Sequence, residues 1–471
     1  MKIVLIPIDN RPVCYTLPLD IAAIDPELEL ILPERKLLGD LKNKADIEGI
    51  LNWLKEQNNI DAVVVSLDTI AYGGLVSSRR GNENASEILN RINKLKLILS
   101  EKKAKVYAFS SIMRISNNNV NEEEKEYWSK YGKMIFEYSF NLHKSEKTRE
   151  SECANKCKCN ELRIPEEILE DYLATRNRNY LVNKEYLEWA GSKIIDTLVY
   201  SKDDCAEYGL NVKEAELLQN DINHLGVNAL VKTGADEIPL TLLSRAYSDF
   251  KHRKVQIYPE FLSPDTTDKI SKYEDISVFE SVKSQIELAG GVLSDKDEAD
   301  LTLVVNNFVE QQGEIVMGVF EKGFSKELQL PESPYFIADI LNANGGDNLF
   351  VENFLLHNPN LSNFYGYSAW NTTGNTLGSG ICAAVIKLLS TNPNETAFKK
   401  LQFVRFMDDW AYQANVRQEL KKEIEKPDIK ITKSKMKKYE DRINTFLESD
   451  FKEVEYGFPW DRFFEIEVKT T

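Results

Sequence analysis

Two adjacent acidic pairs, Asp203-Asp204 and Asp236-Glu237, are the residues best suited to do chemistry in this chain. Each pair directly follows a short apolar run. Hydrolysis of a glycosidic bond ordinarily uses two carboxyl groups, one to protonate the leaving oxygen and one as nucleophile or base. In substrate-assisted enzymes the N-acetyl oxygen of the sugar is the nucleophile, and one carboxylate orients it. Either pair could present both carboxyl groups to the same sugar.

Each acidic pair also has a purely structural interpretation. Asp203-Asp204 could be a solvated loop or the cap of the next helix, although that helix is expected to begin several residues later. Asp236-Glu237 stands at a predicted helix N-terminus, where the helix dipole stabilises carboxylates in their ionised form. Ionised groups suit an orienting or basic role better than that of a general acid. We therefore expect Asp204 to be the general acid and Asp203 the acetamide-orienting base, with Asp236-Glu237 as the rival pair.

Polar side chains that follow other apolar runs would complete a substrate site. In the densest such segment, Trp370 offers a flat face to a sugar ring, and Asn371 and Asn375 offer donors and acceptors to hydroxyl groups. The alternative is a helix-capping loop with one core tryptophan. The other candidate substrate-binding residues are Asp9, Asn10, Arg11, Asp68, Tyr72, Arg79, Arg114 and Asp339. An arginine among them could clamp a carboxylate or phosphate, or simply pair with a neighbouring aspartate.

Nine apolar runs, separated by helical stretches, are typical of buried parallel strands. They are Ile3–Ile8, Ala62–Leu67, Val106–Phe109, Thr197–Tyr200, Ala229–Val231, Val255–Tyr258, Leu301–Val305, Tyr335–Ala338 and Phe364–Ala369. In such sheets ligands bind at the carboxyl ends of the strands, where these polar residues lie. We expect an α/β fold with a (β/α)8-barrel-like main domain. A closed barrel needs eight strands, so one run would be an edge or hairpin strand, and an open doubly wound sheet is the alternative.

The domain boundaries follow changes in composition. Residues 1–393 are expected to form the barrel-like catalytic domain, with a helical insertion at about 117–194. Residues 394–471 are predicted to be a charged, helical C-terminal region. Its aromatic tail, Phe458–Phe464, is expected to pack as a terminal strand or cap against the main domain.

Composition limits the classes of partner. The 471 residues are 42% hydrophobic and carry a net charge of −16, whereas binding to nucleic acid needs a basic face. No apolar run reaches the roughly 18 residues of a membrane span, and no signal peptide is recognisable. We therefore expect a cytoplasmic protein that binds a small-molecule or oligosaccharide substrate, with neither nucleic acid nor membrane as partner. The oligomeric state stays open.

Neither a metal nor a cofactor is predicted. The spacing of Cys153, Cys157 and Cys159 matches no standard pair of zinc knuckles, and none of the four histidines follows an apolar run. Acid–base work would therefore fall to carboxyl groups.

Two other functions are compatible with the same residues. In a metal-dependent hydrolase or lyase, four aspartates would gather Mg²⁺ or Mn²⁺, which prefer oxygen ligands. These are Asp9, Asp68, Asp203 and Asp339. The third possibility is a non-catalytic carbohydrate-binding protein.

Four motifs resemble a bacterial family known as domain of unknown function 4127, over essentially the whole chain. They are Pro7–Pro12, Tyr72–Arg79, Gly234–Glu237 and Trp370–Thr376. That resemblance implies no mechanism. More loosely, the strand-ending Asp203-Asp204 and Trp370-Asn371 resemble the acetamide-handling sites of family 84 β-N-acetylglucosaminidases. The Gly234–Glu237 motif resembles the Gly-Gly-Asp-Glu of family 20 hexosaminidases. These resemblances imply a β-N-acetylhexosaminidase, the most specific form of the expected glycoside hydrolase.

Overall fold

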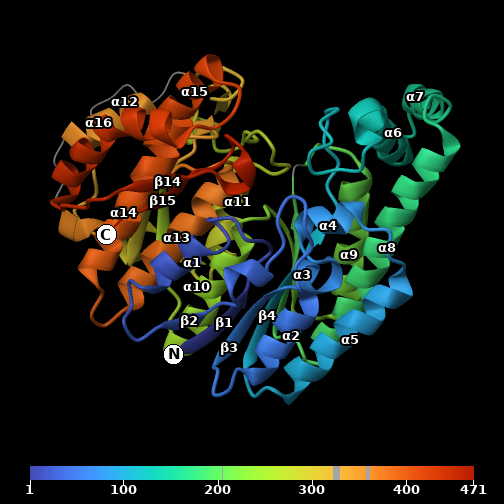
Figure 1. The fold of residues 1–471 in the computed structure, drawn as a ribbon, viewed down its shortest axis with the longest axis horizontal. Helices are drawn as coiled ribbons and strands as arrows, with labels where there is room; N and C mark the ends of the chain where they lie inside the picture. Colours follow the sequence, from blue (N-terminus) through green and yellow to red (C-terminus); the bar gives the residue numbers. More distant parts are fainter. Residues whose placement is uncertain (204, 322–328, 357–360, 471) are drawn as a thin grey trace.

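The computed structural model describes residues 1–203, 205–321, 329–356 and 361–470. Most of its parallel strands form two sheets, and β10 (Gly313–Glu314) and β12 (Asn342–Ala343) pair separately (Figure 1). The first has the order β2-β1-β3-β4-β5-β6: β2 (Glu29–Ile31), β1 (Lys2–Ile6), β3 (Ala62–Ser66), β4 (Lys105–Ile112), β5 (Thr197–Lys202) and β6 (Ala229–Thr233). The second has the order β13-β11-β9-β7-β8: β13 (Phe364–Ser368), β11 (Tyr335–Asp339), β9 (Leu301–Asn306), β7 (Gln256–Phe261) and β8 (Val292–Leu293).

Each of the nine predicted apolar runs coincides with a strand of these two sheets, so the expected α/β class with parallel sheets is confirmed. Within the described residues the edge strands of each sheet do not pair with each other. The pairing therefore shows two open sheets and does not show the closed eight-stranded barrel expected from the sequence. Five runs belong to the first sheet and four to the second. The pattern of apolar runs along the chain does not predict this division.

The first sheet separates two hydrophobic cores, because successive residues of a strand point to opposite faces. Val63 and Val65 face one core, together with side chains of α2 (Ile47–Glu56), α5 (Ala85–Glu101), α8 (Glu166–Gly191) and α9 (Leu210–Leu225). Ala62 and Val64 face the other core, which contains α10 (Ile238–Lys251) and continues into the second sheet. One continuous core therefore holds the two sheets together.

Helix α13 (Thr373–Leu389) covers the second sheet and packs against α10. The helix lies very close to strand β11, since a side chain at Gly380 would come within 1.9 Å of the Phe336 ring. The remaining shorter elements are α1 (Thr16–Ala22), α3 (Leu67–Tyr72), α4 (Leu75–Arg80), α11 (Val278–Leu288) and α12 (Asn348–Leu356).

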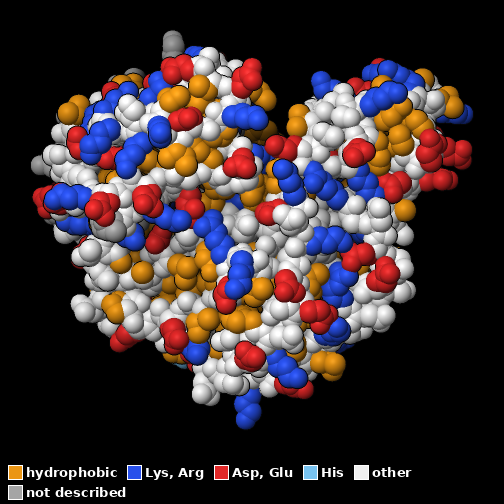
Figure 2. All heavy atoms as spheres, viewed as in Figure 1, with side chains coloured by type: hydrophobic (Ala, Val, Ile, Leu, Met, Phe, Trp, Pro, Cys, Tyr) orange, Lys and Arg blue, Asp and Glu red, His pale blue; other side chains and the backbone are white. Residues whose placement is uncertain are grey.

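Two groups of helices rise above the strands at the carboxyl end of the first sheet (Figure 1). The helices α6 (Trp128–Thr148) and α7 (Ser151–Glu161) lie between β4 and β5 in the chain. The C-terminal group contains α14 (Glu395–Arg405), the π-helix η5 (Phe406–Val416), α15 (Arg417–Glu423) and α16 (Ile429–Leu447), followed by the hairpin of β14 (Glu455–Gly457) and β15 (Glu467–Lys469). The surface is hollowed between the two groups (Figure 2). No helix in the described part of the chain has the length and apolarity needed to cross a membrane.

Candidate functional site

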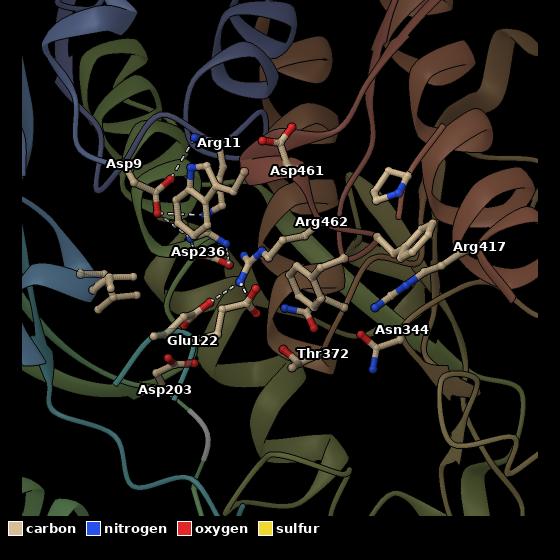
Figure 3. Close-up of a pocket in the computed structure, with 18 of the residues that line it drawn as sticks. Asp9, Arg11, Glu122, Asp203, Asp236, Asn344, Thr372, Arg417, Asp461 and Arg462 are labelled. Carbon is tan, nitrogen blue, oxygen red and sulfur yellow. Dashed lines mark hydrogen bonds and ion pairs between the residues drawn. The ribbon is translucent and has the colours of Figure 1, made fainter. Parts of the chain in front are cut away.

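A cleft of about 560 Å³ lies where the carboxyl ends of both sheets meet (Figure 3). Loops that follow β1, β5 and β6 supply Asp9, Asp203 and Asp236 from the first sheet. The loop that follows β13 of the second sheet supplies Asn371, and the residue after β12, a strand that pairs with β10, is Asn344. A further part of the wall is formed by residues 460–464 of the C-terminal tail. Arg417 and Lys421 of α15 and residues 425–427, which follow this helix, also line the cleft. The cleft thus occupies the edge at which ligands of parallel sheets bind.

Arg11 forms the centre of a buried charge cluster on the first-sheet side of the cleft. Its guanidinium donates to both oxygens of Asp236, with Nη1–Oδ2 and Nη2–Oδ1 distances of 3.0 and 2.5 Å. Nε donates to Asp9 at 2.9 Å, and Nη1 donates to Glu465 at 2.9 Å. All four residues are at most 7% exposed. The Arg11 backbone N–H also donates to Asp9 at 3.0 Å, a local turn contact that fixes the loop after β1.

Three carboxyl groups around one guanidinium cannot all be neutralised by it. Burial raises the pKa of Glu465 to about 7, although Arg11 opposes that shift. Burial likewise raises the pKa of Asp236, against the effect of Arg11 and with the help of Asp9. The cluster therefore holds a proton more readily than ordinary carboxyl groups do. Of Asp236 and Glu465, the two carboxyl groups with raised pKa values, Asp236 lines the cleft.

A second charge cluster lies beside the first and contains three arginines, Arg79, Arg114 and Arg462. Glu123 accepts hydrogen bonds from Arg79 at 3.2 Å, Arg114 at 2.9 Å and Arg462 at 2.7 Å. Although burial opposes ionisation, these three guanidinium groups hold the pKa of Glu123 well below its usual range. Asp203 pairs with Arg79 at 3.1 Å and with Arg114 at 3.4 Å. The cleft therefore contains one carboxyl group with a raised pKa, Asp236, and one with a lowered pKa, Glu123.

The aromatic tail forms a wall of the cleft. The indole N–H of Trp460 donates to the side chain of Asn10 at 2.8 Å. The guanidinium carbons of Arg11 and Arg462 lie 5.0 and 4.7 Å from the centroid of its ring, within the range of cation–π attraction. These contacts fix the half-buried indole at the edge of both charge clusters. The expected packing of the tail against the main domain therefore contributes directly to the site.

Backbone strain concentrates in the same cleft. Eleven described residues other than glycine have positive φ angles. Five of these line the cleft: Tyr273, Asn344, Asn371, Trp460 and Asp461. Such conformations are costly for bulky residues like tyrosine and tryptophan, and they gather at functional sites where the surrounding structure maintains them. This concentration supports a functional role for the cleft, independently of its charges.

The structure brings only part of the predicted site together. The predicted residues that line the cleft are Asp9, Arg11, Arg114, Asp203, Asp236 and Asn371. Asn10 and Arg79 do not line the cleft, but each contacts a residue that does. Asn10 accepts a hydrogen bond from Trp460, and Arg79 forms an ion pair with Asp203. Asp204 lies outside the described residues. Trp370 is 3% exposed and packs edge-on against Phe464, so it sits in the core instead of offering a face to a sugar.

Five other predicted residues are buried away from the cleft, and four of them make hydrogen bonds inside the protein. Asp68 accepts from the backbone of Ser111, and burial raises its pKa to about 7. Burial also raises the pKa of Asp339, which accepts from Asn306 and Tyr367, to about 7. Tyr72 is 2% exposed, and Asn375 donates to the helix-capping Thr372. The fifth residue is Glu237.

Glu237 points away from its neighbour Asp236. It is fully buried, accepts from the backbone of Ala235 and from Gln285, and lies against α13. Gly234 makes this turn possible, since its φ is +111° and a side chain there would lie 1.7 Å from a Glu237 oxygen. The adjacent pair expected to act together is therefore divided between the cleft and the core.

The four aspartates of the metal-dependent alternative are not gathered at one point. Asp68 and Asp339 belong to the separate buried networks described above. Across the described ranges, no group of three or more His, Cys, Asp or Glu side chains has the geometry to hold a metal ion.

Several lining residues were not predicted from the sequence. They are Glu122, Glu123, Arg417, Lys421 and the tail residues Trp460–Phe464. Glu465, behind the cleft, is 454 positions from its partner Arg11. One feature of the sequence could have indicated these residues: the tail is unusually dense in aromatic and charged side chains. We interpreted that density as a sign of packing alone.

The chain belongs to the family described as protein of unknown function (DUF4127), whose family model matches residues 3–469. No curated protein and no solved structure shows significant similarity to it.

Proposed function

We propose that this protein is a glycoside hydrolase whose two carboxyl groups are Asp236 and Asp9. The observation that carries the proposal is their placement against Arg11 at the wall of the cleft. Asp9 Oδ2 and Asp236 Oδ1 lie 2.8 and 2.5 Å from the same nitrogen, Nη2 of Arg11. These two oxygens are therefore no farther apart than the sum of the two distances. That bound is compatible with the roughly 5–5.5 Å spacing of retaining glycosidases and falls short of the roughly 6.5–9.5 Å of inverting ones.

Asp236 is the proposed general acid. Burial raises its pKa, and burial also raises the pKa of Glu465, which binds the same arginine. The Asp236 carboxyl donates a proton to the leaving oxygen as the glycosidic bond breaks. It then accepts a proton from the water that releases the sugar.

Asp9 is the proposed nucleophile. Its carboxylate attacks the anomeric carbon as the leaving group departs, and water later breaks the resulting ester bond. On an N-acetylhexosaminide, Asp9 would instead orient the acetamide, whose oxygen makes the attack. Trp460, Asn371 and Thr372 supply the flat face and the hydrogen-bonding groups for the sugar in this scheme. Asp203, paired with Arg79 and Arg114, has a positioning role.

A panel of nitrophenyl glycosides, with and without the 2-acetamido group, tests the proposal. We expect turnover of at least one member, and a rate reduced by about 10²–10⁴-fold in Asp236→Asn and in Asp9→Asn. A strongly activated leaving group should mask the loss of Asp236, because it needs little protonation, and should not mask the loss of Asp9. The matched control is Asp297→Asn, an exposed position outside the cleft.

Other outcomes would redirect the assignment. Full activity in both variants would refute the assigned roles. Tight sugar binding without turnover by the wild type would indicate a carbohydrate-binding protein. Loss of turnover in EDTA, restored by Mg²⁺ or Mn²⁺, would favour the metal-dependent alternative.

A further inference from the structure

Arg417, the first residue of α15, is a buried cation with few partners. The residue is 5% exposed and lines the cleft. Its Nη1 donates to Gln413 at 2.8 Å, whereas its Nε is buried with no hydrogen-bond partner in the described part of the chain. No carboxylate of the described residues lies within 4.0 Å of it. A buried charge is ordinarily paired, because leaving it without a partner is costly.

The acidic residues around Arg417 are committed to other donors. Those that act on it from a distance are Glu314, Asp408 and Glu465. Glu314 accepts from the side chain of Asn344 at 2.7 Å, and Glu465 accepts from Arg11. Asp408 accepts from Gln413 at 3.0 Å. The protein therefore places negative charge near Arg417 without neutralising it directly.

The cations of the cleft fall into two groups. Arg11, Arg114 and Arg462 are all ion-paired with cleft carboxylates. Arg417, Lys421 and the exposed Lys426 have no ion pair among the residues that the structure describes. Arg417 and Lys421 are four positions apart on α15, so they share one face of the helix. In Figure 3 the guanidinium of Arg417 points toward the cleft beside Asn344, on the side opposite Asp9.

We propose that Arg417 and Lys421 bind an anionic substituent of the ligand, a carboxylate, phosphate or sulfate. The identification of that ligand as an acidic sugar rests on the proposed function; the anion site itself rests on the unpaired cations. A guanidinium binds planar carboxylates and tetrahedral oxyanions through two parallel N–H groups, and a neighbouring ammonium adds charge. The amide of Asn344, held beside Arg417 by Glu314, borders the same subsite.

Isothermal titration calorimetry of the full-length protein tests this site with D-glucuronate, D-glucose 6-phosphate and D-glucose. We expect the wild type to bind at least one acidic sugar more tightly than glucose, with an affinity that falls as salt is added. In Arg417→Gln this preference should fall by about tenfold or more, with glucose binding unchanged. The order of the two acidic sugars distinguishes carboxylate from phosphate recognition. Arg163→Gln, an exposed arginine outside the cleft, is the control.

Lys421→Gln covers the case in which Arg417→Gln fails to fold, because Lys421 is exposed and its loss removes no packing. It should weaken binding of the acidic sugar severalfold. Unchanged affinity in both variants, equal binding of glucose, or no binding of either acidic sugar at millimolar concentration would overturn the proposal. Binding of acidic sugars by a protein that hydrolyses nothing would refute the hydrolase and leave the anion site. Hydrolysis of sugars without a preference for acidic ones would refute the anion site and leave the hydrolase.

Discussion

Arg11 and Asp236 form a two-pronged ion pair across 225 positions of the chain, with both members buried in the wall of the cleft. The loop after the first strand is thereby joined to the N-terminus of α10. Glu465, from the C-terminal tail, joins the same guanidinium. A single side chain therefore connects three segments that must be in place before the cleft exists.

Replacement of Arg11 by glutamine should destabilise the fold by about 3–5 kcal/mol at pH 7, because three buried carboxyl groups lose their counter-charge. The loss should shrink at pH 5, because Asp236 and Glu465, whose pKa values burial raises, can take up protons instead. Urea unfolding at the two pH values measures both effects, with Arg163→Gln as the control. A loss below about 1 kcal/mol at pH 7, or one independent of pH, would contradict this account.

Trp460, which lines the cleft, and Trp370, which lies in the core, should respond oppositely to substitution. Trp460→Ala should weaken binding of any sugar that the wild type turns over, seen as a raised KM, with little change in Tm. Trp370→Ala should cost about 3–5 kcal/mol of stability, as removal of a buried aromatic side chain does. Comparison of KM and Tm for both variants decides the matter. A raised KM confined to a stable Trp370 variant would restore the sugar-platform role predicted from the sequence.

The strands were predictable because most residues of the nine apolar runs are buried and the runs carry a strong local pattern. Within the two sheets the strands β2 and β8 were missed; they have three and two residues and lie at sheet edges with partly exposed side chains. Such short segments lack a recognisable period. The division into two sheets depends on which strands pair, and pairing is a long-range property.

The candidate site was predictable only where a side chain follows its own strand. Asp9, Asp203 and Asp236 meet that condition and line the cleft. Asp68 follows a strand as well, yet it turns back into the protein to accept a backbone N–H. Glu465 follows no long strand, and only tertiary packing brings it to Arg11.

The cysteines of α7 should be dispensable. Cys153 and Cys157 are buried on the inner side of this short helix, and Cys159 is exposed. Replacement of all three by serine should leave the fold and any turnover intact, since neither charge cluster involves this helix. Circular dichroism, activity and elemental analysis check the expectation. Stoichiometric zinc that disappears in the triple variant would show that the helix holds a metal.

The buried carboxyl group of Glu237 should make stability depend on pH. Burial, with Glu274 and Asp236 adding to it, raises its pKa from 4.5 to about 8. Between these values the folded protein keeps a proton that the unfolded chain releases. The free energy of unfolding must therefore fall as pH rises through this range, by roughly 1 kcal/mol per pH unit from this group alone.

Glu237→Gln removes that titration and isolates its contribution from those of Asp68, Asp339 and Glu465, which shift in the same direction. The stability of the variant relative to the wild type should therefore increase steadily from about pH 4.5 to about pH 8, measured as Tm or by urea unfolding. Glu298→Gln, at an exposed position, should follow the wild type throughout. Parallel pH profiles for the wild type and Glu237→Gln would mean that Glu237 is already ionised in the folded protein at neutral pH. That is the ionised state expected from the sequence for a carboxylate at a helix N-terminus, and the burial of Glu237 argues against it.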